Sequence, residues 1–153
     1  MNLSKPTGAA TAAYSFDVEL RCSREHAWQV LVEKIDDWWL SDFRMLGVDS
    51  KVTLEAKLGG QLSEQNSSGA FLEWYNVQMC TPGSDLYLVG HLGEDWGGPT
   101  VSMMSLKLRD DGNRCQLKVS DALLGNVTTK SVDVAQIGWT SIFGDSYKAF
   151  AEK

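Results

Sequence analysis

The stretch QIGWTSIFGDSYKAF, residues 136–150, decides the fold, because it belongs to a long C-terminal helix predicted over about residues 132–152. An apolar stripe at helical spacing runs along one side of that helix: Ala135, Gly138, Trp139, Ile142, Ser146, Ala149 and Phe150. Gly138 and Gly144 weaken the helix, since each glycine costs roughly 1 kcal/mol relative to alanine. Two interpretations follow. Either the backbone approaches a neighbour closely at Gly138, or the missing side chain leaves room for a guest beside Trp139.

The segments before this helix alternate between apolar and polar residues, as strands do. Residues 14–22 form the first predicted strand, a helix follows Ser23 to about Ile35, and Trp38–Leu40 form a second short helix or turn. Further strands are expected at residues 51–58, 61–65, 70–80, 85–92, 101–109 and 114–120, with a connection at 121–131. Short turns between strands favour antiparallel neighbours, so the sequence predicts an α+β domain with a curved antiparallel sheet covered by the last helix.

The chain has 153 residues, which fits one domain. We expect a flexible leader over residues 1–13 and a single domain over residues 14–153. The leader lacks the apolar core of a signal peptide, and no apolar run reaches the length of a membrane helix. A cytoplasmic location without membrane insertion is therefore expected.

The net charge is −6, and no Lys or Arg occurs between Leu58 and Leu106. Nucleic-acid binding needs a basic surface, so it is not expected. The three cysteines and two histidines show no metal-ligand spacing, and neither a metal site nor a cofactor is expected. No serine lies in a nucleophile motif, and no glycine-rich loop is suited to phosphate.

Several short motifs carry a family resemblance over residues 14–153. They are CSREHAW at 22–28, Trp38–Trp39, LGGQLSE at 58–64, Trp74 to Val77, Pro82–Gly83, GHLG at 90–93 and IGWTSIFGDSYKAFAEK at 137–153. In their order and spacing the chain resembles the START-like (SRPBCC) superfamily, which includes the birch-pollen allergen. Within it, the chain is similar to domains related to the activator of the heat-shock chaperone ATPase. The resemblance implies the helix-grip fold: a seven-stranded antiparallel sheet wraps a long C-terminal helix, with a cavity between them and two short helices at one end.

Large apolar residues are candidates to line that cavity, although each is also a candidate for ordinary core. They are Trp39, Phe43, Tyr75, Val77, Trp96, Met103, Leu123, Trp139, Ile142 and Phe143, with Gly138 and His91 beside them.

A few polar residues are candidates for acid–base chemistry. His91 lies in a predicted central strand, and Glu64 and Glu73 lie on neighbouring strands. The alternative for each is a solvent-facing side chain. Arg44 is the basic residue expected nearest the helix pair, where it would either meet an anionic group or lie on the surface.

Three functions therefore remain open. The first is binding of an apolar or aromatic, uncharged small molecule (lipid- or polyketide-like) under the C-terminal helix. The second is an enzyme resembling polyketide cyclases or dehydratases, which would use His91 or Glu73. The third is a protein-binding module that stimulates a chaperone ATPase. Whether the chain is an enzyme and how it assembles are not decided by its sequence.

Overall fold

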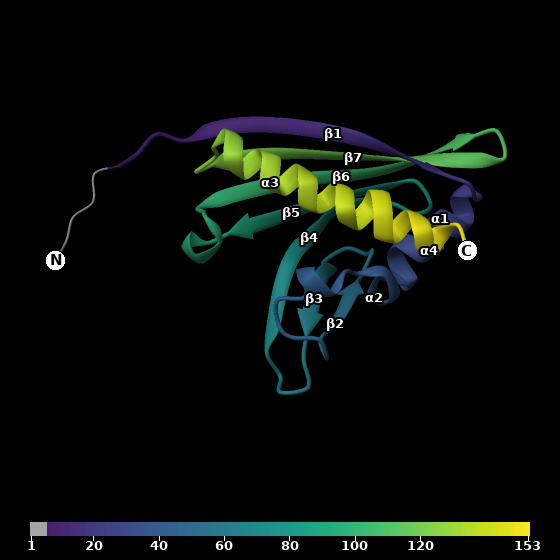
Figure 1. Ribbon diagram of the computed structural model, residues 1–153, viewed down its shortest axis with the longest axis horizontal. Coiled ribbons are helices and arrows are strands. Elements are labelled where there is room, and N and C mark those ends of the chain that lie inside the picture. The colour runs from purple at the N-terminus through teal and green to yellow at the C-terminus, as the bar shows by residue number, and fades with distance from the viewer. Residues whose placement is uncertain (1–5) are drawn as a thin grey trace.

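A curved, seven-stranded antiparallel sheet forms the frame of the protein, described over residues 6–153 by a computed structural model (Figure 1). The strands are β1 (Ala10–Leu20), β2 (Lys51–Leu54), β3 (Gln61–Gln65), β4 (Phe71–Thr81), β5 (Asp85–Leu92), β6 (Thr100–Asp111) and β7 (Arg114–Gly125). The helices are α1 (Arg24–Glu33), α2 (Ile35–Trp38), η1 (Ser41–Phe43), η2 (Glu94–Trp96), α3 (Thr129–Trp139), η3 (Thr140–Tyr147) and α4 (Lys148–Ala151).

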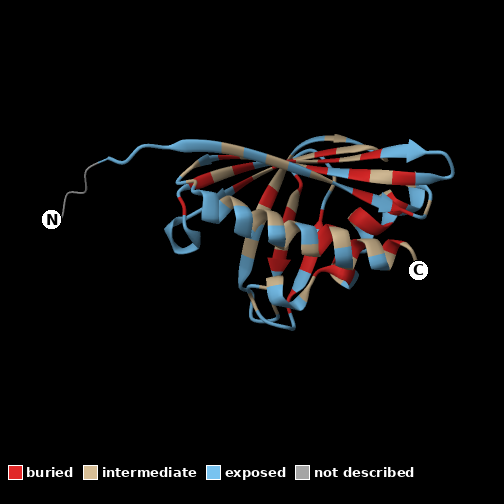
Figure 2. Ribbon diagram, turned by 45° about the horizontal axis from the view of Figure 1, so that its top comes forward, coloured by how far each residue is buried: buried red, intermediate tan, exposed pale blue. Residues whose placement is uncertain are grey.

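The strand order is β1-β7-β6-β5-β4-β3-β2, so the first strand pairs with the last one. Side chains alternate between the two faces, and the buried ones gather on the face toward the helices (Figure 2). Leu88, Leu106 and Leu117 are examples, each at most 2% exposed. This confirms the predicted antiparallel sheet, with β5 at its centre.

The C-terminal helix crosses the inner face of the sheet as the sequence predicted, although it begins three residues earlier, at Thr129 (Figure 1). Thr128 and Ser131 form a reciprocal capping box at its start. Its middle part, η3, is a π-helix, a form that often occurs at functional sites. Tyr147 in this segment is fully buried and donates a hydrogen bond to the Ala27 carbonyl (2.7 Å), which joins the helix to α1.

The helix pair α1 and α2 closes one end of the sheet. Ser23 caps α1 by accepting a hydrogen bond from the His26 amide (3.1 Å). The indole of Trp38 donates to the Val30 carbonyl (2.8 Å), and its ring packs against Phe143 in η3. Trp38, the first residue of the tryptophan pair, therefore belongs to the structural core.

The end of the C-terminal helix is tied to the end of β1. Glu152 accepts hydrogen bonds from the Arg21 amide (2.7 Å), the Arg21 guanidinium and the Lys148 ammonium (3.0 Å). Burial pushes the pKa of Glu152 up, but these donors outweigh it and lower the pKa to about 2. The ionised carboxylate thus holds the helix on the sheet.

Several predicted boundaries differ from the structure. β1 starts at Ala10, so the predicted leader 1–13 overlaps the strand, and residues 1–5 of that leader lie outside the described residues. β2 ends at Leu54, four residues before the predicted end. The largest difference is β7, which continues to Gly125 where a connection was predicted from residue 121. This extension matters for the site, because it places Asp121 and Leu123 on a strand.

Candidate ligand-binding site

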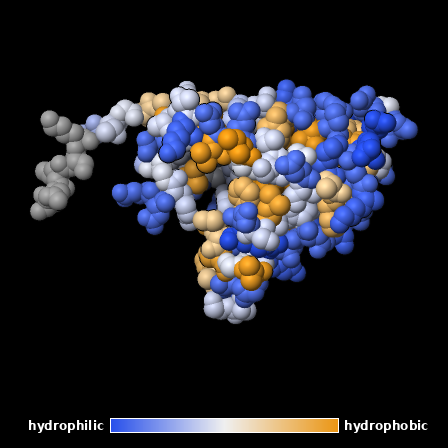
Figure 3. All heavy atoms as spheres, in the orientation of Figure 1, coloured by the Kyte–Doolittle hydropathy of each residue, from blue (hydrophilic) through white to orange (hydrophobic). Residues whose placement is uncertain are grey.

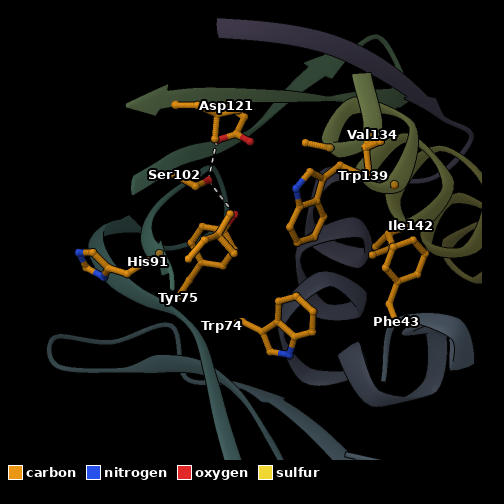
Figure 4. Close-up of a pocket in the computed structure, with 14 residues that line it drawn as sticks. Phe43, Trp74, Tyr75, His91, Ser102, Asp121, Val134, Trp139 and Ile142 are labelled. Carbon is orange, nitrogen blue, oxygen red and sulfur yellow. Dashed lines mark hydrogen bonds between the residues drawn. The ribbon is translucent and has the colours of Figure 1, made fainter. Parts of the chain in front are cut away.

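A cavity of about 220 Å³ lies between the C-terminal helix and the inner face of the sheet. Figure 3 shows the molecule hollowed beside this helix, with apolar side chains gathered around the hollow. The cavity is lined by Phe43, Trp74, Tyr75, Gly90, His91, Leu92, Ser102, Asp121, Leu123, Val134, Ala135, Gly138, Trp139 and Ile142 (Figure 4).

Gly90 shapes the floor of the cavity. It faces inward near the C-terminal end of β5, and a Cβ atom there would lie 2.6 Å from the Trp74 carbonyl oxygen and 2.9 Å from the Tyr75 ring. Such distances are shorter than real Cβ contacts, so only glycine fits without a shift. The Tyr75 ring therefore crosses β5 and brings its hydroxyl to Ser102 on β6 (2.7 Å).

Gly138 faces an aromatic ring rather than empty space. A Cβ atom at this position would lie 3.2 Å from Cε1 of Phe43, which comes from η1 at the end of the helix pair. Neither of the two sequence interpretations is complete. The glycine admits the Phe43 ring to the helix surface, and the cavity continues beside that ring.

A buried chain of hydrogen bonds forms the polar part of the cavity wall (Figure 4). Tyr75 Oη lies 2.7 Å from Ser102 Oγ, and Ser102 Oγ donates to Asp121 Oδ1 at 2.7 Å. Tyr14 Oη donates to the other carboxylate oxygen at 2.9 Å. Asp121 is 2% exposed and forms no ion pair with any residue that the structure describes.

Burial dominates the electrostatics of this chain. It raises the pKa of the Asp121 carboxyl, and the hydrogen bonds from Ser102 and Tyr14 offset that rise only in part. Burial also raises the pKa of Tyr75, to which the negative charge of Asp121 adds. The tyrosine hydroxyl therefore stays protonated, and the carboxyl is the group in this wall whose charge changes most readily.

Aromatic rings form the opposite wall. Trp139 lies 6.0 Å from Tyr75, 6.1 Å from Trp39 and 5.7 Å from Phe143 between ring centroids. Trp74 also contacts this group, with its ring 5.6 Å from Trp39. Rings held on several sides keep a cavity from collapsing, because their rotamers are fixed by packing.

A β-bulge explains why Trp74 and Tyr75 both reach the cavity. Leu62 pairs with Tyr75 and Ser63 pairs with Glu73, so Trp74 is an extra residue on β4. Regular alternation would place Trp74 on the face opposite Tyr75. The sequence analysis missed Trp74 as a lining residue for this reason.

A second, smaller cavity of about 130 Å³ adjoins the first one. It shares Trp74, His91 and Leu92 with the main cavity and is otherwise lined by Met45, Leu72, Glu73 and Trp96. This second cavity lies on the side of the η2 turn, to which Trp96 belongs.

The structure brings together seven of the twelve residues predicted to bind a ligand. Those that line the main cavity are Phe43, Tyr75, His91, Leu123, Gly138, Trp139 and Ile142. Trp39 and Phe143 are buried core residues, and Val77 packs against the core. Met103 is 45% exposed, because it alternates with the inward Ser102 and Met104. Trp96 lines the second cavity.

His91 borders both cavities, but its side chain is exposed and points away from the main cavity in Figure 4. It follows Gly90, which faces inward, so alternation turns the imidazole outward. Glu73 is also exposed, where it accepts hydrogen bonds from Gln61 (2.8 Å) and Asn76. Neither side chain reaches the buried wall.

Glu64 points inward, but its role is structural. It is fully buried and accepts hydrogen bonds from the amides of Met45 (3.1 Å) and Leu46 (2.7 Å) and from the Trp74 indole (3.3 Å). The carboxylate therefore holds the segment after η1 against the sheet.

Arg44 is neither a surface residue nor free to meet an anion. Its side chain is 11% exposed and is bound to the Asp36 carboxylate (2.8 Å) and the Ser50 carbonyl (2.7 Å). No Lys or Arg is among the described residues that line either cavity.

Within residues 6–153, no group of three or more His, Cys, Asp and Glu side chains is placed to hold a metal ion. No helix there is long and apolar enough to cross a membrane.

Asp121 and Ser102, which form the polar part of the wall, are also among the site residues that sequence reasoning missed. Asp121 followed Ser120 at the end of an apolar alternation, and such a polar pair is typical of a strand end. The signal that could have found Asp121 is Leu123. It is an apolar residue two positions further on, and it continues the inward alternation of Cys115, Leu117 and Val119.

Comparison with known proteins supports the fold. An uncharacterized protein from Rhizobium leguminosarum is 14% identical, with a TM-score of 0.67 over 95% of this chain and 97% of that chain. An AHSA1-like protein from Aeromonas hydrophila is 13% identical, with a TM-score of 0.62 over 92% of each chain. DynU16, from the dynemicin biosynthetic locus, is 16% identical, with a TM-score of 0.63 over 92% of this chain and 47% of that chain.

No protein-family model matches the chain, and no curated protein matches it either. At these identities the solved structures show a common architecture. The chain has the α+β helix-grip fold, with a curved seven-stranded antiparallel sheet around a C-terminal helix.

Proposed function

We propose that this protein, as a member of the START-like superfamily, binds a neutral aromatic or apolar small molecule in the cavity beside Trp139. The observation that carries the proposal is the cavity itself, about 220 Å³ of largely apolar space under the helix. A ligand there buries aromatic surface against Trp139, Tyr75 and Trp74.

Size and charge narrow the ligand class. An apolar protein cavity of about 150 Å³ holds benzene, so the larger space here suits a ligand of two fused rings. An anionic ligand would be desolvated without a cationic partner, since neither Lys nor Arg lines the site in the described residues. Asp121 adds repulsion for an anion.

The two alternative functions receive less support. A cyclase or dehydratase that uses His91 or Glu73 needs one of these side chains inside the cavity, whereas both are exposed. A module that acts only through a protein partner, as the resemblance to a chaperone-ATPase activator suggested, has no need of an internal cavity lined by aromatic rings. Small-molecule binding uses this cavity and needs neither His91 nor Glu73 inside it.

A dye titration tests the proposal. We expect the neutral dye N-phenyl-1-naphthylamine to bind saturably with enhanced fluorescence, and the anionic dye 1-anilinonaphthalene-8-sulfonate to bind more weakly. Ala135→Leu places a larger side chain in the cavity and is expected to weaken binding of the neutral dye at least roughly tenfold.

The matched control is Asp133→Leu, which adds the same side chain at an exposed position of α3. It is expected to leave binding of the neutral dye within roughly twofold of the original protein. Equal affinities of the Ala135→Leu variant and the original protein would show that the dye binds elsewhere, and the proposal would fail.

A further inference from the structure

The hydrogen-bond chain in the cavity wall has a fixed direction when Asp121 is ionised. A carboxylate only accepts hydrogen bonds, so Tyr14 and Ser102 both donate to it. Ser102 has a single hydroxyl proton, which is used on Asp121. The 2.7 Å contact between Tyr75 and Ser102 therefore requires Tyr75 to be the donor.

This direction leaves Tyr75 as an acceptor toward the cavity. Its proton points to Ser102, while the lone pairs of its oxygen receive no hydrogen bond from the residues that the structure describes. The oxygen sits at the inner end of an otherwise apolar space.

Trp139 supplies a donor on the opposite wall. Its indole N–H has no hydrogen-bond partner within residues 6–153, unlike the indoles of Trp38, Trp39 and Trp74. Figure 4 shows this nitrogen turned toward the side of the cavity where Ser102 and Asp121 lie. The Trp139 and Tyr75 rings meet edge to face, with centroids 6.0 Å apart, and both line the main cavity. A ligand group beside this ring pair can therefore face both the indole N–H and the Tyr75 oxygen.

We infer that the cavity selects an aromatic ligand carrying a neutral hydroxyl group, which donates to Tyr75 Oη and accepts from the Trp139 indole N–H. Asp121 is a positioning residue for this selectivity. It acts through Ser102, because its carboxylate sets the direction of the hydrogen-bond chain. The inference rests on the proposed function, since it concerns the ligand of the same cavity.

Other head groups fit this wall less well. The oxygen of an ether or ketone has no proton to offer, so it would leave Tyr75 Oη desolvated and without a donor. An ammonium group would seek Asp121 directly, but both carboxylate oxygens are already bonded and the residue is 2% exposed. A hydroxyl both donates and accepts, so it can bond Tyr75 Oη and the Trp139 indole N–H at the same time.

Three bicyclic probes test the inference: naphthalene, 2-naphthol and 2-methoxynaphthalene. Their affinities can be measured by tryptophan fluorescence at about pH 8. An alkaline pH is used because burial raises the pKa of Asp121, and the chain has its stated direction only while this carboxyl is ionised. We expect 2-naphthol to bind roughly tenfold more tightly than naphthalene, because two hydrogen bonds are gained. We expect 2-methoxynaphthalene to bind at least roughly tenfold more weakly than 2-naphthol.

Two variants separate selectivity from packing. Tyr75→Phe keeps the ring and removes the acceptor, so 2-naphthol should fall to within roughly threefold of naphthalene. Ser102→Ala frees the Tyr75 proton for the ligand, so 2-methoxynaphthalene should gain roughly tenfold relative to 2-naphthol. Tyr87→Phe removes a hydroxyl from the other face of β5 and serves as the matched control, with selectivity unchanged.

The outcomes distinguish this inference from the proposed function. If the unmodified protein binds none of the three probes, the proposed function fails. If naphthalene binds but 2-naphthol gains nothing over it, or if the 2-naphthol preference persists in Tyr75→Phe, the ligand site stands and the hydroxyl selectivity is overturned. Naphthalene binding by each variant reports whether its cavity is intact.

Discussion

Replacing Gly90 with alanine tests the close approach that places Tyr75. The added Cβ would lie 2.6 Å from the Trp74 carbonyl oxygen and 2.9 Å from two ring carbons of Tyr75. Because the nearest atom belongs to the backbone of β4, that strand must move or the Tyr75 ring must tilt. Overpacking of this kind costs about 1–3 kcal/mol. In a chain of this size, each kcal/mol of destabilisation lowers the melting temperature by about 2–4 °C.

Urea unfolding followed by circular dichroism measures this cost. Gly93→Ala is the matched control, since a Cβ at Gly93 meets no atom within 4 Å and its backbone φ of −77° suits any residue. We expect Gly93→Ala to be neutral or stabilising by up to about 1 kcal/mol, through the less flexible unfolded chain. If the two variants unfold at the same urea concentration, Gly90 is not required for the approach of Tyr75, and the reasoning is refuted.

Gly138→Ala should stabilise the helix by up to about 1 kcal/mol. The added Cβ should also push the Phe43 ring into the cavity, so the affinity for the neutral dye should fall without a loss of thermal stability. Equal dye affinity would contradict this. Glu64→Ala should lower the free energy of unfolding in urea by about 3 kcal/mol, because the amides of Met45 and Leu46 lose their acceptor. A loss below about 0.5 kcal/mol would contradict the structural role of Glu64. Glu152 has a lowered pKa of about 2, so its contribution is present above its ordinary value of 4.5 and is lost as pH falls from there. Glu152→Gln should therefore lower the free energy of unfolding by at most about 3 kcal/mol at neutral pH. Solvent screening around Arg21, whose side chain is 69% exposed, reduces this loss. Near pH 2 the substitution should leave stability almost unchanged. A pH-independent loss would contradict this.

The strand and helix pattern was predictable because single faces of the chain are apolar. Alternation along residues 14–22 and 114–120 identified two strands, although not their full lengths or their pairing with each other. The stripe around Trp139 identified the helix that covers the sheet. What alternation cannot show is a polar residue inside. Asp121 sits on the buried face of β7 because Ser102 and Tyr14 from two neighbouring strands satisfy it, and those partners are distant in sequence.

The orientation of side chains near irregular backbone was also beyond the sequence. The bulge in β4 turns Trp74 inward beside Tyr75, and no residue in that strand signals it. For β5, apolar residues on both faces left the direction of His91 open, and the inward position of Gly90 decides it. Gly138 drew attention to the correct part of the helix, but Phe43 could be placed against it only once the fold was known.

The cavity also has a consequence for stability. Aromatic side chains around Trp139 are packed on their outer sides and face unfilled space on the inner side, so dispersion contacts are forfeited there. A bound ligand restores those contacts and stabilises the folded state by mass action.

The indole N–H signal of Trp139 in a two-dimensional ¹⁵N–¹H NMR spectrum tests the central claim most directly. The chain has six tryptophans, and Trp139→Phe assigns the relevant signal. On titration with 2-naphthol, we expect the Trp139 signal to shift saturably as its N–H gains an acceptor, while the signal of Trp28 on α1 stays in place. A saturable shift confined to other indoles, with the Trp139 signal unmoved, would contradict binding in this cavity.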